Sequence, residues 1–149
     1  MTRWLDDAQQ SAWRKLIQVV ELLPGALDSQ LRRDADLTHF DYFTLAMLSE
    51  APDRTLRMTA LADLTNSTLP RLSHVVSRLE ERGFVERTRS AADRRATNAV
   101  LTEDGWRKVV DSAPGHVEAV RGAVFAGLDA SDVADLDRVM AKILGGLSG

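Results

Sequence analysis

Residues 56–105 decide the fold of this chain; they read LRMTALADLTNSTLPRLSHVVSRLEERGFVERTRSAADRRATNAVLTEDG. In the first half of this stretch the apolar residues recur at helical spacing, and the second half holds two short runs rich in β-prone residues. Residues 60–65 and 67–83 predict two helices joined by a tight turn. Residues 84–90 and 97–102 predict the strands of a hairpin. The expected unit is a helix-turn-helix followed by a β-hairpin.

Local signals mark where these elements begin and end. Thr59 is placed to cap the first of the two helices, and Asn66 and Ser67 supply the turn and the cap of the second. Pro70 falls in the first helical turn, where a missing N–H costs little. Gly83 is expected to end the helix.

The helix over residues 67–83 has two different faces. Leu72, Val75, Val76 and Leu79 fall together on one side and are expected to be buried. A polar face remains, made of Ser67, Thr68, Pro70, Arg71, His74, Ser77 and Arg78. A helix fits a DNA major groove about 12 Å wide, where arginine can read guanine edges. The alternative is the solvated face that any amphipathic helix shows.

The tip of the hairpin carries Asp93, Arg94 and Arg95. Arginines at a projecting tip cannot pack against a core, and they suit a minor groove about 6 Å wide, where negative potential is concentrated. We expect Asp93 to pair with Arg95 and stiffen the turn, while Arg94, with or without Arg95, meets DNA. The alternative is a solvated loop that only improves solubility.

Charge is unevenly distributed along the chain. The total is -3 over 149 residues, yet residues 67–97 hold seven arginines against four carboxylates, a local balance of +3. A whole-chain sum therefore does not exclude nucleic acid as a partner.

Long helices are expected on both sides of the central stretch. Apolar residues trace one stripe over residues 3–33, where Pro24 should kink or split the helix, and another over residues 106–128, interrupted at Pro114. A helix capped by Thr38 and a last helix from about Ser131 complete the chain. One winged module is too small to cover all these stripes, so we expect a second copy of the chain to cover them.

Several classes of protein are disfavoured by composition. The chain has no cysteine, and its three histidines have no partner at metal-binding spacing, so we expect neither a metal nor another cofactor. No catalytic triad, phosphate loop or paired carboxylate can be argued, so we expect no enzyme. No apolar run approaches the roughly 20 residues of a membrane span, and no signal peptide is apparent; we expect a cytoplasmic protein without membrane contact.

Three motifs in this order resemble the winged helix-turn-helix of the MarR family of bacterial transcription regulators. They are Leu79-Glu80-Glu81-Arg82-Gly83, Asp93-Arg94-Arg95 and Leu101-Thr102-Glu103-Asp104-Gly105. The family's order of six helices, with the winged module in the middle, fits the whole chain. One departure is Pro70, which removes a backbone donor from the first turn of the recognition helix.

The resemblance implies a mainly α (α+β) fold in a single unit spanning residues 1–149. Residues 52–105 would form the winged module that binds double-stranded DNA, and residues 1–35 and 106–149 the helices of a homodimer. From the recognition helix and the arginine wing together, we expect a dimeric, sequence-specific repressor that blocks polymerase by occupying its DNA site. Two-fold symmetry predicts a near-palindromic operator with half-sites roughly 10 bp apart, or a multiple of it.

Members of the family often bind a small anionic aromatic effector between the dimer helices and the winged module. In this chain Trp13, His39, Tyr42 and Arg57 are the candidates to line such a cleft. Core packing is the alternative role for Trp13.

Two rival functions fit the same sequence. The first is a winged-helix module that uses its cationic surface to bind an acidic protein, and generic duplex DNA would not compete with that partner. The second is a small-molecule-binding protein without any DNA function, in which ligand would still raise the melting temperature.

Overall fold

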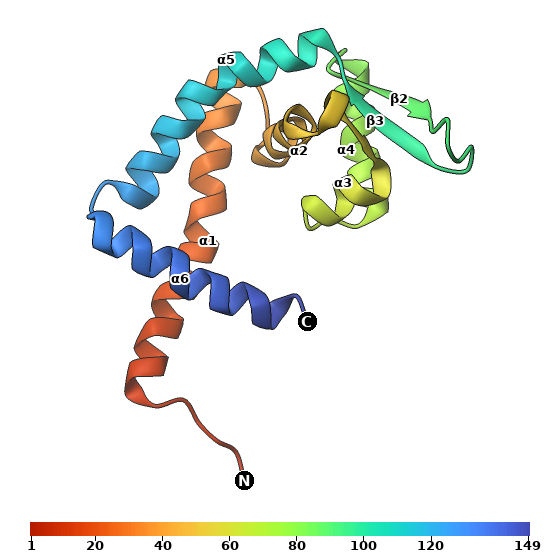
Figure 1. Cartoon of the computed structure of the whole chain (residues 1–149). Helices are drawn as coiled ribbons and strands as arrows, with labels where there is room; N and C mark the ends of the chain where they lie inside the picture. The colour runs from red at the N-terminus through yellow and green to blue at the C-terminus, as the bar shows by residue number, and fades with distance from the viewer.

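The computed structural model describes residues 1–149 and is mainly helical, with one small antiparallel sheet, as expected (Figure 1). In chain order the elements are α1 (Asp7–Ala35), α2 (His39–Glu50), the 3-10 turn η1 (Pro52–Arg54), β1 (Thr55–Arg57), α3 (Met58–Leu64), α4 (Leu69–Glu81), β2 (Val85–Arg89), β3 (Thr97–Leu101), α5 (Glu103–Val120), the π turn η2 (Arg121–Phe125) and α6 (Ala130–Leu147).

The two helices of the predicted helix-turn-helix are α3 and α4, joined through Asn66 in the left-handed conformation. The predicted inner face of α4 is confirmed, because Leu72, Val75, Val76 and Leu79 are all buried. They belong to one core that the C-terminal end of α1, α2, α3, the sheet and α5 share. The recognition helix is thereby fixed to the body by one apolar face, which leaves its other face available.

The sheet contains one strand more than the sequence predicts. Its order is β1-β3-β2, so β3 is central, and Ala99 pairs with Leu56 on one side and Arg87 on the other. The predicted hairpin is β2 and β3. β1 has only three residues, too few to show an alternating pattern, and it forms because β3 offers an edge for pairing.

Two of the expected helix caps are wrong. Thr59 lies inside α3, which begins at Met58 after an N-cap residue, Arg57, whose side chain makes no capping bond. α4 is capped by Thr68, not Ser67, and the Thr68 Oγ1 accepts from the Arg71 N–H at 3.3 Å. Gly83 does follow the end of α4 with a positive φ of 82°.

The long helices are more continuous than predicted. α1 runs through Pro24 and α5 through Pro114 without being split. The break comes later, after the π turn η2. α6 is capped by Asp129 and begins at Ala130, one residue before the predicted start near Ser131. No helix of the chain is both long enough and apolar enough to cross a membrane.

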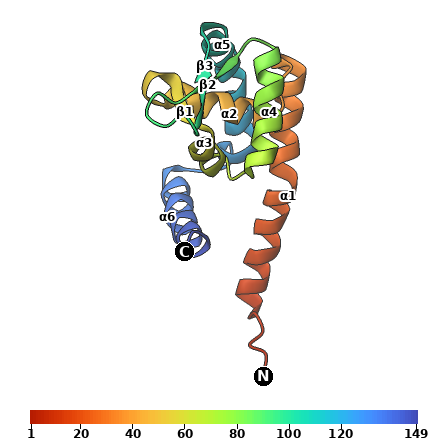
Figure 2. The same ribbon diagram turned by 90° about the vertical axis from the view of Figure 1, so that its right-hand side faces the viewer.

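The terminal helices reach away from the winged module. In two views at right angles, α6 and the N-terminal half of α1 extend beyond the body formed by α2, α3, α4 and the sheet (Figures 1 and 2). No residue of α6 is buried within the single chain, although the helix is 18 residues long. Its subunit covers these apolar residues only in part: Leu136 and Met140 are half-buried, while Leu144 and Leu147 are exposed.

Candidate nucleic-acid interface

The outer face of α4 is polar and open to solvent over its first two turns. Thr68, Pro70, Arg71 and His74 are exposed, and Ser67 is half-buried at the start of the helix. Because Thr68 caps the helix and Pro70 has no N–H, few backbone donors remain in the first turn. Recognition by this end of α4 must therefore depend on its side chains.

Two arginines of this face contact α2. The Arg71 guanidinium lies 4.4 Å from the centre of the Phe40 ring. The Nη2 atom of Arg78 lies 3.2 Å from Oδ1 of Asp41. Asp41 is only 5% exposed, whereas the Arg78 side chain is 48% exposed. A carboxylate buried to this degree needs its partner. Arg78 therefore ties α4 to α2 and is not the free cation that the sequence suggested.

Ser77 does not face outward as expected. Its hydroxyl donates to the Ser73 carbonyl at 2.9 Å and accepts from the Arg87 guanidinium, also at 2.9 Å. Both of its hydrogen-bonding functions are used inside the subunit, so Ser77 supports the recognition helix from behind.

Arg87, on β2, fastens the hairpin to the recognition helix. Its backbone N–H donates to the Glu80 carboxylate at 2.9 Å, and its guanidinium reaches Glu80 at 3.0 Å, Ser77 at 2.9 Å and Ser73 at 3.4 Å. The backbone hydrogen bond, followed by the guanidinium, lowers the pKa of Glu80. The sequence showed Arg87 only as a positive charge, because nothing in its spacing reveals a partner on α4.

The tip of the hairpin is held by Asp93, but not through the expected ion pair. The Asp93 carboxylate accepts the backbone N–H of Arg95 at 3.0 Å, and the Ala96 N–H donates to the Asp93 carbonyl at 3.0 Å. Neither the Arg94 nor the Arg95 guanidinium forms an ion pair with any carboxylate of the chain. Asp93 thus orders the turn through the backbone and leaves both guanidinium groups free.

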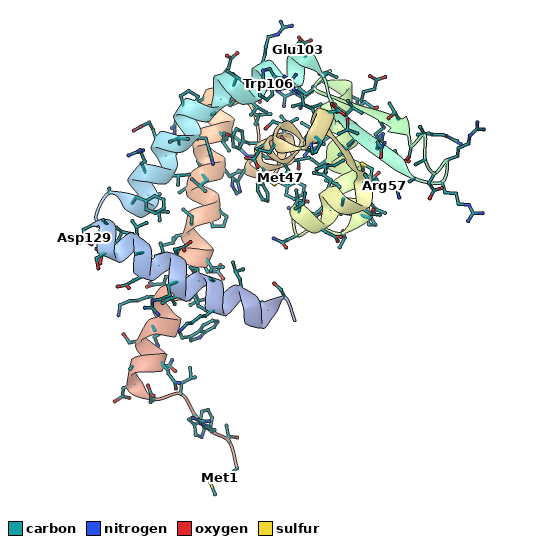
Figure 3. All side chains as sticks on the ribbon, viewed as in Figure 1. Met1, Met47, Arg57, Glu103, Trp106 and Asp129 are labelled. Carbon is teal, nitrogen blue, oxygen red and sulfur yellow. The ribbon has the colours of Figure 1, made fainter.

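The four residues expected to line one effector cleft are not brought together. His39 and Tyr42 lie on α2, where both rings pack near His116 of α5, at 6.1 and 4.4 Å between ring centres. Trp13 is 49% exposed on the N-terminal half of α1, and Arg57 lies beside the hairpin (Figure 3). Trp13 and Arg57 therefore lie apart from the other two, and His116, which the sequence does not link to them, lies beside His39 and Tyr42.

His39 and His116 form a half-buried pair where α2 packs against α5. Burial lowers the pKa of His39, which nearby Asp28 partly opposes, and burial together with the charge of His39 lowers the pKa of His116. The His116 Nδ1 and the Gln30 Oε1 are buried without a hydrogen-bond partner. The cluster therefore favours neutral imidazoles and holds two unused polar atoms.

The histidine pair predicts a fall in the free energy of unfolding as the pH drops from about 7.5 to about 5.5. Both folded-state pKa values lie below 6.5, so the unfolded chain takes up protons first as pH falls through that value. The folded state lowers the pKa values of the Asp28 and Glu80 carboxylates, and this adds stability that is fully present above about pH 4.3. These two groups therefore do not set the window between about pH 7.5 and about pH 5.5.

Urea unfolding at the two pH values measures this effect. The His116→Gln variant should lose less stability than the wild type over the interval, because one depressed histidine is gone. His74→Gln is the control, since His74 is exposed on α4. An identical loss in the wild type and in His116→Gln would contradict the prediction.

The chain is similar to known transcription regulators over its whole length. Residues 35–96 match the family model described as MarR family. The crystal structure of Sco3205 from Streptomyces coelicolor, a MarR family transcriptional regulator in complex with DNA, superposes with a TM-score of 0.93 at 43% identity, over 98% of this chain and 92% of that one. AbsC, a MarR family transcriptional regulator of the same organism, gives 0.93 at 38% identity, over 99% of both chains.

A third relative is known from its sequence. The uncharacterized HTH-type transcriptional regulator YdcH of Bacillus subtilis strain 168 is 34% identical over 93 residues. That alignment covers 61% of this chain and 63% of YdcH, which is less than two thirds of the relative's length.

Proposed function

Because this chain belongs to the MarR family of transcriptional regulators, we propose that it binds a specific duplex sequence as a homodimer and represses transcription by occupying it. The family consists of DNA-binding regulators, not enzymes. The observation that carries the finer proposal is the exposed polar face of α4 beside a hairpin tip with two unpaired arginines. Binding to chromosomal DNA would place the protein in the cytoplasm.

In the proposed complex α4 enters the major groove and the β2–β3 wing enters the adjacent minor groove. Ser67, Thr68, Pro70, Arg71 and His74 would meet base edges and phosphates from the open face of α4. Arg78 can join them only while it keeps Asp41 paired, and Ser77 acts indirectly through its hydrogen bonds. At the wing, Asp93 would position Arg94 and Arg95.

A second copy of the chain would cover the terminal helices. Apolar side chains on α1, α5 and α6 are exposed in the single subunit, and among them Leu22, Leu144 and Leu147 are 60% exposed or more. Exposed apolar surface of this kind marks a protein interface. Since most homodimers are two-fold symmetric, two recognition helices would read a near-palindromic operator.

We also propose that a small aromatic acid releases the DNA. A cleft of about 510 Å³, lined by His116, Val117, Val120, Arg121, Phe125 and Val133, opens between α5, η2 and α6. Its walls are mostly apolar, and Arg121 offers a cation for a carboxylate. His39 and Tyr42 stay part of this proposal through their contact with His116, whereas Trp13 and Arg57 do not.

The wing arginines test the proposed function. We expect Arg94→Ala and Arg95→Ala each to weaken operator binding about tenfold, the effect of roughly 1.4 kcal/mol. Each lost charge should also flatten the plot of log affinity against log salt by about 0.9 for each subunit. Fluorescence anisotropy with DNA from upstream of the chain's own gene, across a salt series, measures both quantities.

Arg107→Ala is the matched control for the wing variants, because Arg107 is an exposed arginine on α5 that pairs only with Asp104, at 3.6 Å. Wild-type affinity and salt slope in both wing variants would contradict the wing's role. The same assay with added aromatic carboxylic acids tests the effector proposal, which fails if none of them releases the DNA.

A further inference from the structure

A groove of about 250 Å³ lies between the wing and the recognition helix. Its lining comes from the β1–α3 junction, from α4, from β2 and from the returning arm of the wing. These residues are Arg57, Met58, Thr59, Leu69, Ser73, Arg87, Arg95, Ala96 and Thr97. Three of these nine residues are arginines, three carry hydroxyl groups and none is acidic. The groove is smaller than the 300–1,000 Å³ typical of pockets for organic ligands, so it suits a small anion.

Two of the three arginines have no carboxylate partner. Arg87 is neutralised by Glu80, whereas neither Arg57 nor Arg95 forms an ion pair. Arg57 also occupies the N-cap position of α3, where its side chain makes no capping bond and its charge opposes the helix dipole. Local stability therefore does not explain an arginine at this position. Two guanidinium groups without a carboxylate partner repel each other in one concave site. An anion bound between them would remove this repulsion.

We propose that this groove holds a backbone phosphate of the bound duplex, contacted by the guanidinium groups of Arg57 and Arg95. The inference rests on the proposed function and adds a site to it. The groove joins α4, through Leu69 and Ser73, to the wing, through Arg95 and Thr97. A DNA strand that passes from the recognition helix to the wing would cross this groove. The Thr59 hydroxyl, exposed at the rim, is a further donor.

The proposal assigns Arg57 a role different from base reading. Phosphate contacts fix the register of a protein on the duplex and carry no sequence information themselves. Arg57→Ala should therefore weaken binding by the same factor for the operator and for an unrelated duplex. The slope of log affinity against log salt concentration should become shallower by about 0.9 for each subunit, or about 1.8 for a dimer. Arg57→Lys keeps the charge and should keep the slope.

Anisotropy titrations of the whole protein with both duplexes, over a salt series, test these expectations, with Arg107→Ala as the charge-matched control. Thermal melting should show that Arg57→Ala is folded, since its side chain is exposed and makes no hydrogen bond. A wild-type slope in Arg57→Ala, alongside a reduced one in Arg94→Ala, would overturn the phosphate site and leave the proposed function intact. If the wild type selects no duplex at all, the proposed function fails and this site with it.

A free anion such as inorganic phosphate presents the same charged oxygens to Arg57 and Arg95 as a phosphate of the duplex does. Inorganic phosphate, compared with chloride at equal ionic strength, distinguishes the two sources. If phosphate raises the melting temperature of the wild type but not of Arg57→Ala, and the DNA salt slope of Arg57→Ala is unchanged, the groove binds a free anion and the assignment to the duplex is wrong.

Discussion

The Gly105→Ala variant is expected to lose about 3 kcal/mol of stability, the upper part of the usual range for overpacking. A Cβ atom at position 105 would lie 2.1 Å from the Phe84 carbonyl oxygen and 2.6 Å from a methyl carbon of Leu101. The carbonyl cannot easily withdraw, because it accepts the Thr102 N–H at 3.0 Å. The clash therefore lies at the point where β2 begins, β3 ends and α5 begins.

Urea or thermal unfolding measures the loss, which corresponds to a decrease of roughly 6–12 °C in melting temperature for a domain of this size. Gly25→Ala is the matched control: a Cβ atom there, inside α1, meets no heavy atom within 4 Å. That variant should be as stable as the wild type, or more stable by up to about 1 kcal/mol, through the higher helix propensity of alanine. A wild-type unfolding midpoint for Gly105→Ala would show that the junction can relax.

Gly105 also shows what the sequence can and cannot explain. The motif that ends in Gly105 supported the family resemblance, yet its physical reason is a contact with the Phe84 backbone, which lies in another element. By contrast, the buried face of α4 follows from spacing alone, because residues three and four apart share one side of a helix. Periodicity along the chain is visible in a sequence. Contact between distant segments is not.

The same distinction explains why Arg78 and Ser77 have partners inside the subunit that the sequence does not predict. The angular positions of these two residues on the helix predict that both lie on the open face. Their side chains nevertheless bond to Asp41 and Arg87, from α2 and β2. Which partner a long side chain reaches depends on how neighbouring elements pack. A helical wheel carries no information about that.

The four candidate effector residues each have a suitable side-chain type, but no spacing rule links them in the sequence. Two of them, His39 and Tyr42, share α2 and remain together, since one helical turn separates them. Trp13 and Arg57 lie on other elements, and their positions depend on the full tertiary arrangement. His116 could be found only from coordinates, because its neighbours come from a helix more than 60 residues earlier in the chain.

The Leu144→Glu variant is expected to convert the proposed dimer into a monomer. The Leu144 side chain is 60% exposed on α6, a helix without any buried residue in the single chain. Burial of one leucine contributes about 1.5–3 kcal/mol, and two-fold symmetry places two copies in the interface. Losing both would weaken dimerisation by roughly 10²–10⁴-fold, before the cost of burying two carboxylates is added.

Loss of the dimer should reduce operator binding by about 100-fold or more, because a monomer contacts one half-site and forfeits the second set of contacts. The winged module should remain folded, since its core contains no residue of α6. Analytical ultracentrifugation gives the oligomeric state, anisotropy gives the affinity, and circular dichroism at matched concentration confirms retention of helix. Affinity for an isolated half-site should be nearly unchanged.

Leu144→Met is the control for these measurements, because it keeps the apolar volume of the side chain and should preserve both the dimer and operator binding. A dimeric Leu144→Glu with wild-type affinity would place the interface elsewhere. A monomeric Leu144→Glu with wild-type affinity for the full operator would contradict cooperative reading of two half-sites. Only combined loss of the dimer and of full-site affinity, with half-site binding retained, fits two recognition helices held at a fixed separation by α1, α5 and α6.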